Sequence, residues 1–186
     1  MHTILKAGAA LQTINKSRFY AWAAHCESEQ QVGAFLRAVA AQHANAHHLA
    51  YAFRIKTPEG IILRFSDAGE PSGTAGKPIL QMLEGQNLIN VCIGVIRYYG
   101  GVNLGTGGLV RAYSGTAKMA LQAALLMPFV EMKLLKLTIQ YNRMDEFTRT
   151  LTQLKGKILN KTFVDAVHVE ISLPASETSA LMNRFS

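Results

Sequence analysis

The sequence has little cysteine and no apolar run long enough to span a membrane. Its two cysteines, Cys26 and Cys92, lie in apolar segments far apart along the chain, which excludes a disulfide framework and a zinc-ligand motif. The longest apolar stretch, residues 119–130, is broken by Gln122 and Pro128 and is too short to cross a bilayer, so we expect a buried helix there. The first residues do not resemble an export signal. We therefore expect a cytoplasmic protein with no membrane attachment.

Acidic residues are scarce relative to basic ones. The chain has 19 Lys and Arg against 12 Asp and Glu, a formal net charge of +7. Residues 129–186 carry eight Lys or Arg and six Asp or Glu, a net charge of +2, which leaves +5 for residues 1–128. This balance favours anionic partners such as RNA, nucleotides or membrane surfaces. No run of Lys and Arg and no motif for DNA specificity occurs, so a basic face must be assembled by folding.

Glycine is concentrated in one part of the chain. Eleven of the 15 glycines fall between Gly69 and Gly115, most of them in two segments, residues 65–80 (the first glycine loop) and residues 97–115 (the second glycine loop). Glycine weakens helices and strands, so its concentration indicates backbone that turns sharply or approaches something closely. Both segments also carry charged residues. The pattern favours a binding surface over simple connections.

Residues 1–128 alternate between strand and helix patterns. Ser28 and Gln31 fit a capping box before an apolar 3.6-residue repeat. Pro78 suits the first turn of a helix. We therefore expect strands at 11–14, 17–25, 49–55, 60–65 and 90–98, and helices at 28–43, 78–84 and 109–126.

Pro128 marks the expected boundary between two domains, residues 1–128 and 129–186. The second part predicts strands at 133–141, 157–163 and 166–173, with helices at 143–154 and 174–185. This βαββα order resembles a ferredoxin-like sandwich that lacks its last strand.

The second glycine loop is flanked by arginine and tyrosine. Arg97 and Tyr98 precede its glycines, and Arg111 and Tyr113 follow them. Arginine offers a planar fork of donors to phosphate, and tyrosine offers a stacking face to bases. The order strand, glycine loop, helix also lets backbone N–H groups at a helix N-terminus receive an anion. The pattern is typical of a phosphate-binding surface.

The first glycine loop contains Asp67, Glu70 and Lys77, which could hold a metal, a proton or a phosphate. Two nearby carboxylates can also serve as general acid and base. The structural alternative is that Asp67 suits a turn and Glu70 caps backbone donors, and it is favoured over catalysis. For the second loop, the structural alternative is that Arg97 neutralises one of the two carboxylates while Tyr98 or its neighbour packs in the core.

No metal site or nucleophile is evident in the sequence. His43 and His47 have the spacing of zinc ligands on a helix, but the predicted helix ends near them and an acidic general base is missing. A structural or surface role is favoured for the histidines. Residues 73–78 lack the Ser or Thr that follows the lysine of a P-loop, and Ser114 lacks a G-x-S-x-G motif. We expect no metal, no cofactor and no catalytic residue.

Four motifs resemble the signature of the IMPACT/YigZ family. They are Ser17-Arg18-Phe19, Ala50-Tyr51, FSDAGEPSGTAGKPIL at residues 65–80 and IRYYGGVNLGTGGLVRAY at residues 96–113. The resemblance covers residues 1–128 in order, and the remainder resembles the small C-terminal domain of bacterial members but stops short. The chain departs from the family at Ala46, where members usually have histidine; His47 is the neighbour that could substitute.

The resemblance implies an α+β protein of two domains. The first would resemble a ribosomal-protein domain and domain IV of elongation factor G, with a mixed or antiparallel sheet covered by helices. The second would resemble domain V of that factor. Eukaryotic relatives regulate translation through an initiation-factor kinase pathway, so the implied theme is translation, without that eukaryotic partner.

These observations predict a non-enzymatic module that binds RNA or the ribosome and acts in translation control. The expected phosphate-binding residues are Arg18, Lys77, Arg97, Gly100, Gly101, Gly105, Thr106, Gly107, Gly108 and Arg111, supported by Asp67, Glu70, Tyr98 and Tyr113. An alternative is a phosphate- or nucleotide-binding enzyme for phosphoryl transfer or hydrolysis, in which Asp67 or Glu70 positions a metal or accepts a proton. A third is that the loops are structural and the function lies in a protein partner.

Overall fold

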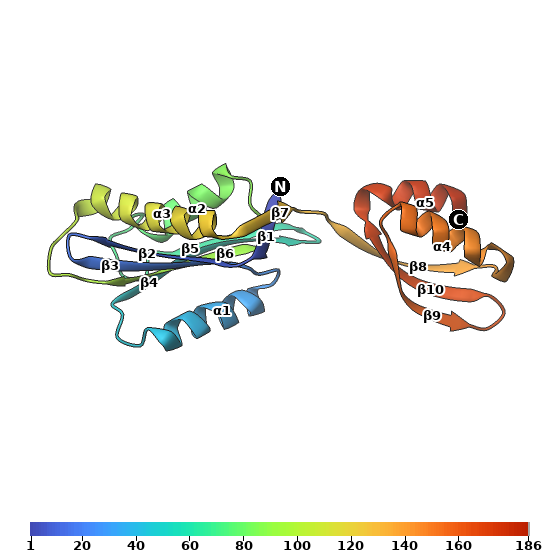
Figure 1. Ribbon diagram of the computed structural model, residues 1–186, viewed down its shortest axis with the longest axis horizontal. Helices are drawn as coiled ribbons and strands as arrows, with labels where there is room; N and C mark the ends of the chain where they lie inside the picture. Colours follow the sequence, from blue (N-terminus) through green and yellow to red (C-terminus); the bar gives the residue numbers. More distant parts are fainter. Residues whose placement is uncertain (186) are drawn as a thin grey trace. The chain divides into compact units, whose positions relative to one another are not determined.

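The computed structural model describes residues 1–185, and the chain forms two compact units, residues 1–129 and 130–186. In each unit helices pack on an antiparallel sheet (Figure 1). The α+β class with two domains, which the sequence predicts, is confirmed. No helix in the described residues is long and apolar enough to cross a membrane.

The first unit is built on a five-stranded sheet with the order β2–β3–β6–β4–β5. Every neighbouring pair is antiparallel. β6 is the central strand and is almost completely buried, as its β-branched, apolar sequence predicts. The strands are β2 (Gly8–Ile14), β3 (Ser17–His25), β4 (His48–Thr57), β5 (Gly60–Ser66) and β6 (Val91–Tyr98).

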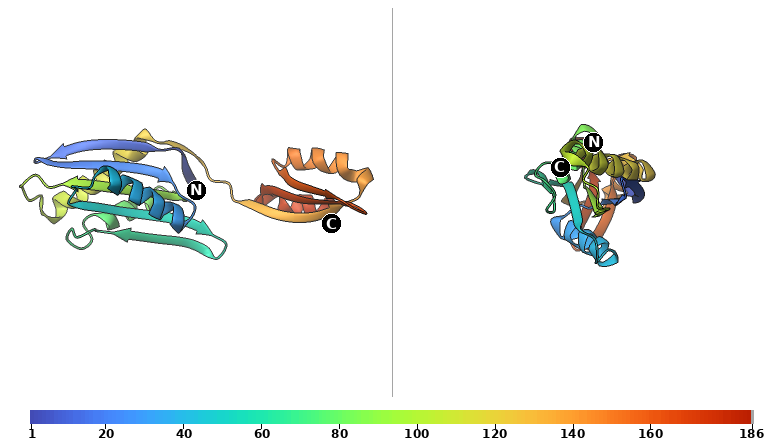
Figure 2. Two further views of the ribbon diagram at one scale, coloured as in Figure 1. Left: turned by 90° about the horizontal axis from the view of Figure 1, so that it is seen from below. Right: turned by 90° about the vertical axis from the view of Figure 1, so that its left-hand side faces the viewer.

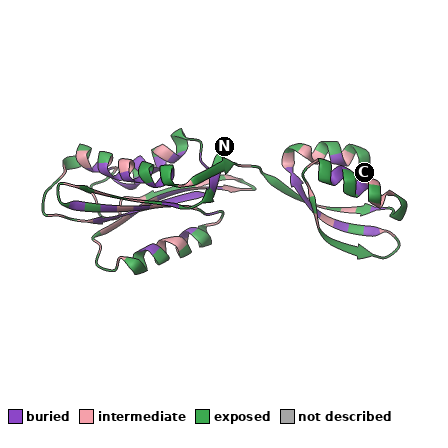
Figure 3. Cartoon of the chain, in the orientation of Figure 1, coloured by how far each residue is buried: buried purple, intermediate pink, exposed green. Residues whose placement is uncertain are grey.

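Helices cover both faces of this sheet. α2 (Gly76–Gly85) and α3 (Gly105–Ala123) pack on one face, and α1 (Glu29–Gln42) packs on the other (Figure 2). The buried residues concentrate on the sheet and on the helix surfaces that face it (Figure 3). α3 presents small side chains such as Ala112 and Ala117 to the sheet, which allow close packing.

The start of α1 confirms the predicted capping pair. The Ser28 hydroxyl accepts a hydrogen bond from the Gln31 backbone N–H at 3.1 Å. The Gln31 side-chain oxygen accepts in turn from the backbone N–H of Glu27 at 2.9 Å, one residue earlier than in a standard capping box. Two of the backbone donors at this helix end are thereby satisfied.

The expectation of a buried helix over residues 119–130 is wrong. α3 ends at Ala123, and β7 (Leu125–Pro128) pairs antiparallel with β1 (His2–Lys6). All four residues of β7 are exposed. The apolar composition suggested a helix because the local sequence does not reveal the partner strand, which lies more than a hundred residues earlier. The expectation also missed β1.

The second unit has the predicted βαββα order. β8 (Met132–Ile139), β10 (Val167–Pro174) and β9 (Lys157–Phe163) form a three-stranded antiparallel sheet with β10 in the middle. α4 (Met144–Gln153) and α5 (Thr178–Phe185) contribute Phe147, Leu151 and Leu181 to its core. Two 3₁₀ turns, η1 (Tyr141–Arg143) and η2 (Ala175–Glu177), precede these helices.

Candidate functional site

The first glycine loop closes around the carboxylate of Asp67. One carboxylate oxygen accepts from the Gly73 N–H at 2.8 Å, and the other accepts from the Ala75 and Gly76 N–H groups at 3.0 and 2.9 Å. Burial raises the pKa of Asp67, but these backbone hydrogen bonds outweigh it and hold the pKa below its usual value. Asp67 therefore supplies the negative charge at the N-terminus of α2 from within the chain.

Gly76 is required by close packing at the same place. A Cβ atom on this residue would lie 2.3 Å from the Ser66 carbonyl oxygen. The loop thus folds tightly onto the end of β5, and its glycine has a structural explanation. Lys77, one residue further, is exposed on the surface of α2.

The two glycine loops meet through a buried ion pair. Arg97 Nη1 lies 2.7 Å from Glu70 Oε1, and both side chains are only 5% exposed. Tyr113 donates its hydroxyl to the same oxygen at 2.6 Å. Burial, and next the hydrogen bond to Glu70, raise the pKa of Tyr113 far above its usual range, so the hydroxyl stays protonated. Of the structural alternatives, the neutralisation of Glu70 by Arg97 is observed.

Histidine and serine side chains complete this network. His48 places Nε2 3.8 Å from Glu70 Oε1, while its Nδ1 lies 2.8 Å from the Ala68 carbonyl oxygen. Ser17 Oγ accepts from Arg97 Nη2 at 3.3 Å and from the Gly100 N–H at 3.2 Å. The sequence favours a structural or surface role for the histidines, but it does not predict that His48 contacts Glu70. His48 lies directly opposite Arg97 in the pairing of β4 with β6, and this strand pairing is the feature that could have identified it as part of the network.

The second glycine loop packs against the turn between β2 and β3. A Cβ atom on Gly100 would lie 2.1 Å from the Lys16 carbonyl carbon, so the close approach requires glycine. The Tyr99 N–H donates to His47 Nδ1 at 3.1 Å, and the Tyr99 hydroxyl donates to Asn103 Oδ1 at 3.0 Å. The start of the second glycine loop is therefore fixed by contacts with the turn between β2 and β3 and with His47.

The N-terminus of α3 differs from that of α2. α3 begins at Gly105, so the four residues from Gly105 to Gly108 form its first turn and not part of a loop as expected. Among the described residues, no side chain caps this end of the helix. Its backbone N–H groups carry the partial positive charge of the helix dipole. α2 has an internal carboxylate at the corresponding place, and α3 has none.

A cavity of about 390 Å³ lies at this open helix end. Both glycine loops contribute to its walls, and α3 forms one side. The lining residues that carry polar or aromatic groups are Glu70, Arg97, Tyr99, Asn103, Gly105 and Thr106. This volume is at the lower end of the range for small-ligand sites.

The expected site residues do not all lie at the cavity. Lys77 and Arg111 are exposed, Gly105 and Thr106 line the cavity, and Arg97 is 4% exposed and bound to Glu70. The remaining glycines and Tyr113 lie in the loops and in α3, as described above.

Arg18 is on the opposite face of the sheet from Arg97. Phe19 and Arg97 are directly paired across β3 and β6, so their neighbours Arg18 and Tyr98 point to the face that carries α1. The Arg18 guanidinium lies 4.7 Å from the centre of the Tyr98 ring. His43 Nδ1 lies 2.7 Å from the Tyr98 hydroxyl on the same face. The fold therefore does not bring these residues together with the cavity.

The residues considered for metal binding are dispersed. Within residues 1–185, no group of three or more His, Cys, Asp or Glu is arranged to hold a metal ion. α1 ends at Gln42, so His43 and His47 do not share a helix. Cys26 and Cys92 are buried beneath α1, and burial raises the pKa of the Cys26 thiol to about 11.

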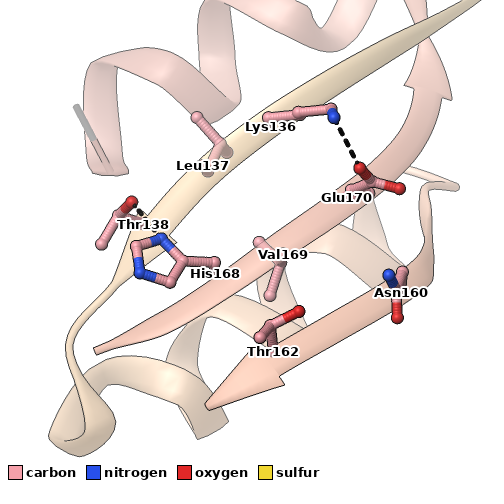
Figure 4. Close-up of a pocket in the computed structure, with 8 residues that line it drawn as sticks. All are labelled: Lys136, Leu137, Thr138, Asn160, Thr162, His168, Val169 and Glu170. Atoms are coloured by element: carbon pink, nitrogen blue, oxygen red, sulfur yellow. Dashed lines mark hydrogen bonds and ion pairs between the residues drawn. The ribbon is translucent and has the colours of Figure 1, made fainter. Parts of the chain in front are cut away.

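The second unit has a polar hollow on its sheet, with a volume of about 290 Å³ (Figure 4). Four of its charged and polar groups bind one another in pairs: Lys136 pairs with Glu170 at 2.7 Å, and Thr138 Oγ1 lies 2.9 Å from His168 Nδ1. The Lys136 side chain is 84% exposed. Exposed pairs of this kind contribute little energy and indicate no ligand, so the cavity of the first unit is the better candidate.

Comparison with known proteins identifies the families of both parts. A family model described as the Impact N-terminal domain matches residues 15–121, and one described as a domain of unknown function (DUF1949) matches residues 137–186. IMPACT family member YigZ of Escherichia coli (strain K12) is 37% identical over 180 residues, which cover 95% of this chain and 88% of the relative. IMPACT family member YvyE of Bacillus subtilis (strain 168) is 31% identical over 178 residues, covering 96% and 82%.

A solved structure agrees with this relationship. A crystal structure of a hypothetical protein covers 98% of this chain and 89% of its own, with a TM-score of 0.74 and 34% identity. The two-domain translational regulator Yih1 covers 64% of this chain and 48% of its own, with 26% identity and a TM-score of 0.44. The second similarity is too low to support a structural argument.

Proposed function

This chain belongs to the IMPACT family, and on that premise we propose that it is a non-enzymatic module that binds RNA or the ribosome in translation control. The phosphate backbone would contact the first unit at the open end of α3. The translation context follows from the motif resemblance, whose eukaryotic members regulate translation.

The observation that carries the proposal is the difference between the two helix N-termini. Asp67 occupies the N-terminus of α2, whereas that of α3 is open to the cavity. An uncapped helix N-terminus with glycines in its first turn can donate backbone hydrogen bonds to phosphate at close range. The basic excess of residues 1–128 has the sign that attracts a polyanion.

Two of the expected basic residues remain available for phosphate beside the loops. Lys77 and Arg111 are exposed, and neither is ion-paired within the described residues. Arg18 is also exposed, but it lies on the opposite face of the sheet from the cavity. Arg97 has a different proposed role, since its guanidinium joins the two loops through Glu70. It would shape the binding surface and contact RNA only along the cavity wall.

The first experiment measures binding of the purified chain to ribosomes and to single-stranded RNA across a salt series. Each phosphate contact with single-stranded nucleic acid contributes about −0.7 to the slope of log K against log salt. The two contacts of Lys77 and Arg111 give a slope of about −1.4, so raising the salt from about 50 to about 200 mM weakens binding about 7-fold. Binding that is undetectable or independent of salt would contradict the proposal.

A matched pair of variants locates the contact. The double variant Lys77→Ala, Arg111→Ala removes two charges beside the loops and should reduce the slope by about 1.4. The control Lys6→Ala, Arg37→Ala removes two exposed charges on β1 and α1 and leaves the same net charge. If both variants bind alike, the loops are not the contact surface, and binding through a protein partner becomes the better account.

The enzymatic alternative receives less support from the geometry. The Asp67 carboxylate is occupied by backbone N–H groups, and Glu70 is bound to Arg97 and Tyr113. Neither carboxylate is free to position a metal or to accept a proton from a substrate.

A further inference from the structure

The cavity beside α3 has features that fit one nucleotide of an RNA chain, an inference that rests on the proposed function. One wall offers backbone donors, because Gly105 and Thr106 line the cavity at the uncapped helix end. In the described part of the chain, the Thr106 hydroxyl makes no hydrogen bond. It can therefore add a side-chain donor for a phosphate oxygen.

A second, independent feature is an unsatisfied donor on a residue that lines the cavity. The Arg97 side chain lines the cavity, is 5% exposed, and its Nε has no hydrogen-bond partner within residues 1–185. Buried donors without a partner are uncommon because each one costs free energy. A ligand acceptor that reached this nitrogen would relieve this cost.

The cavity also contains an aromatic platform. The Tyr99 side chain is 42% exposed, and the Arg97 guanidinium lies 5.3 Å from the centre of its ring. The hydroxyl is held by Asn103 at 3.0 Å. The ring is therefore fixed before a ligand arrives. Stacking on a preformed aromatic face suits an unpaired base of any sequence.

The charge of the cavity limits how much negative charge a bound ligand can carry. Arg97 is its one basic lining residue among those described, and Glu70 already neutralises it. The helix dipole, equivalent to about half an elementary charge, remains for the ligand. This suits the single charge of a phosphodiester. It does not suit a triphosphate, which needs several cations or a metal ion.

We propose that the cavity accommodates one unstacked nucleotide of single-stranded RNA. Its phosphodiester would lie at the N-terminus of α3, and its base would lie on the Tyr99 ring beside the Asn103 amide. The wider surface with Lys77 and Arg111 would contact the neighbouring phosphates.

The test uses the full chain and a short single-stranded RNA that contains the fluorescent base aminopurine. Stacking on Tyr99 should quench the fluorescence when the RNA binds. Tyr99→Ala should weaken binding about 5- to 100-fold, the range for loss of one base–aromatic stack, and should abolish the quenching. Tyr99→Phe keeps the ring and should retain the quenching.

The matched control is Tyr141→Ala in the second unit, where the tyrosine is 54% exposed. This variant should bind and quench like the unchanged chain. If RNA binds but Tyr99→Ala has the same affinity and quenching, the nucleotide assignment is wrong while the proposed function stands. If the unchanged chain binds neither RNA nor ribosomes at low salt, the proposed function itself fails.

Discussion

Removal of the Arg97 side chain should destabilise the first unit strongly. The Arg97–Glu70 pair has an N···O distance of 2.7 Å, and both side chains are 5% exposed. At an effective dielectric constant of about 20, this distance corresponds to an attraction of about 6 kcal/mol, largely offset by the cost of taking both ions out of water. Arg97→Ala removes the attraction and leaves the Glu70 carboxylate buried. We expect a loss of about 3–5 kcal/mol in the free energy of unfolding.

The chain provides a specific probe for this measurement. Its one tryptophan is Trp22 on β3, so tryptophan fluorescence during urea unfolding reports on the first unit alone. The double variant Glu70→Leu, Arg97→Met replaces both ions by apolar groups and should recover most of the loss, because no buried charge is left unpaired. Glu70→Gln, which keeps an acceptor for Tyr113, should cost less than Arg97→Ala.

Two results would refute this reasoning. A loss below about 1 kcal/mol for Arg97→Ala would mean that the pair behaves as an exposed ion pair. Additive losses in the double variant would mean that the two side chains are not coupled. If the reasoning holds, Arg97→Ala is a poor probe of RNA binding, since it disturbs both loops. Lys77 and Arg111 are the better choices.

Three further predictions concern the loops and the core. Asp67→Asn should lower the free energy of unfolding of the first unit at neutral pH. Because the pKa of Asp67 is lowered in the folded state, this difference from the unchanged chain should disappear as the pH falls below about 4. A difference in stability that persists in acid would contradict the role of the Asp67 carboxylate. Gly100→Ala should lower the urea midpoint more than Gly101→Ala, because a Cβ atom on Gly100 would clash with the Lys16 backbone. A Cβ atom on Gly101 would meet open space, so Gly101→Ala should have only a backbone cost of about 1–2 kcal/mol. The reverse order would contradict the packing at Lys16. The thiols of Cys26 and Cys92 should resist a thiol reagent at about pH 8 until the protein unfolds. Burial raises the pKa of Cys26 to about 11, and Cys92 is fully buried. Rapid labelling of the folded protein would contradict this prediction.

Local patterns were sufficient to predict most elements of the fold. The capping pair at Ser28 and the strand over residues 17–25 depend on neighbours along the chain, and both are confirmed. β1 and β7 were missed because each needs the other as a partner and neither has a strong pattern of its own. The start of α3 at Gly105 was missed because four residues that include three glycines suggest a loop.

The sequence predicted which loops contribute residues to the site, but not which of these residues contact one another. The sequence left Arg97 with two possible carboxylates, and only the fold determines that Glu70 is its partner. Asp67 lies in the same loop, but its oxygens face the backbone of α2. Alternation along β6 places Tyr98 on the opposite face of the sheet, so a short distance in sequence did not mean a shared site.

The most direct measurement of the central claim is an amide NMR titration of the full chain with short single-stranded RNA. We predict that the largest shifts occur at the backbone N–H groups of residues 105–108, at the open end of α3, and that residues 73–76 change little because Asp67 already occupies the end of α2. Shifts concentrated at residues 73–76 or confined to the second unit would contradict this prediction.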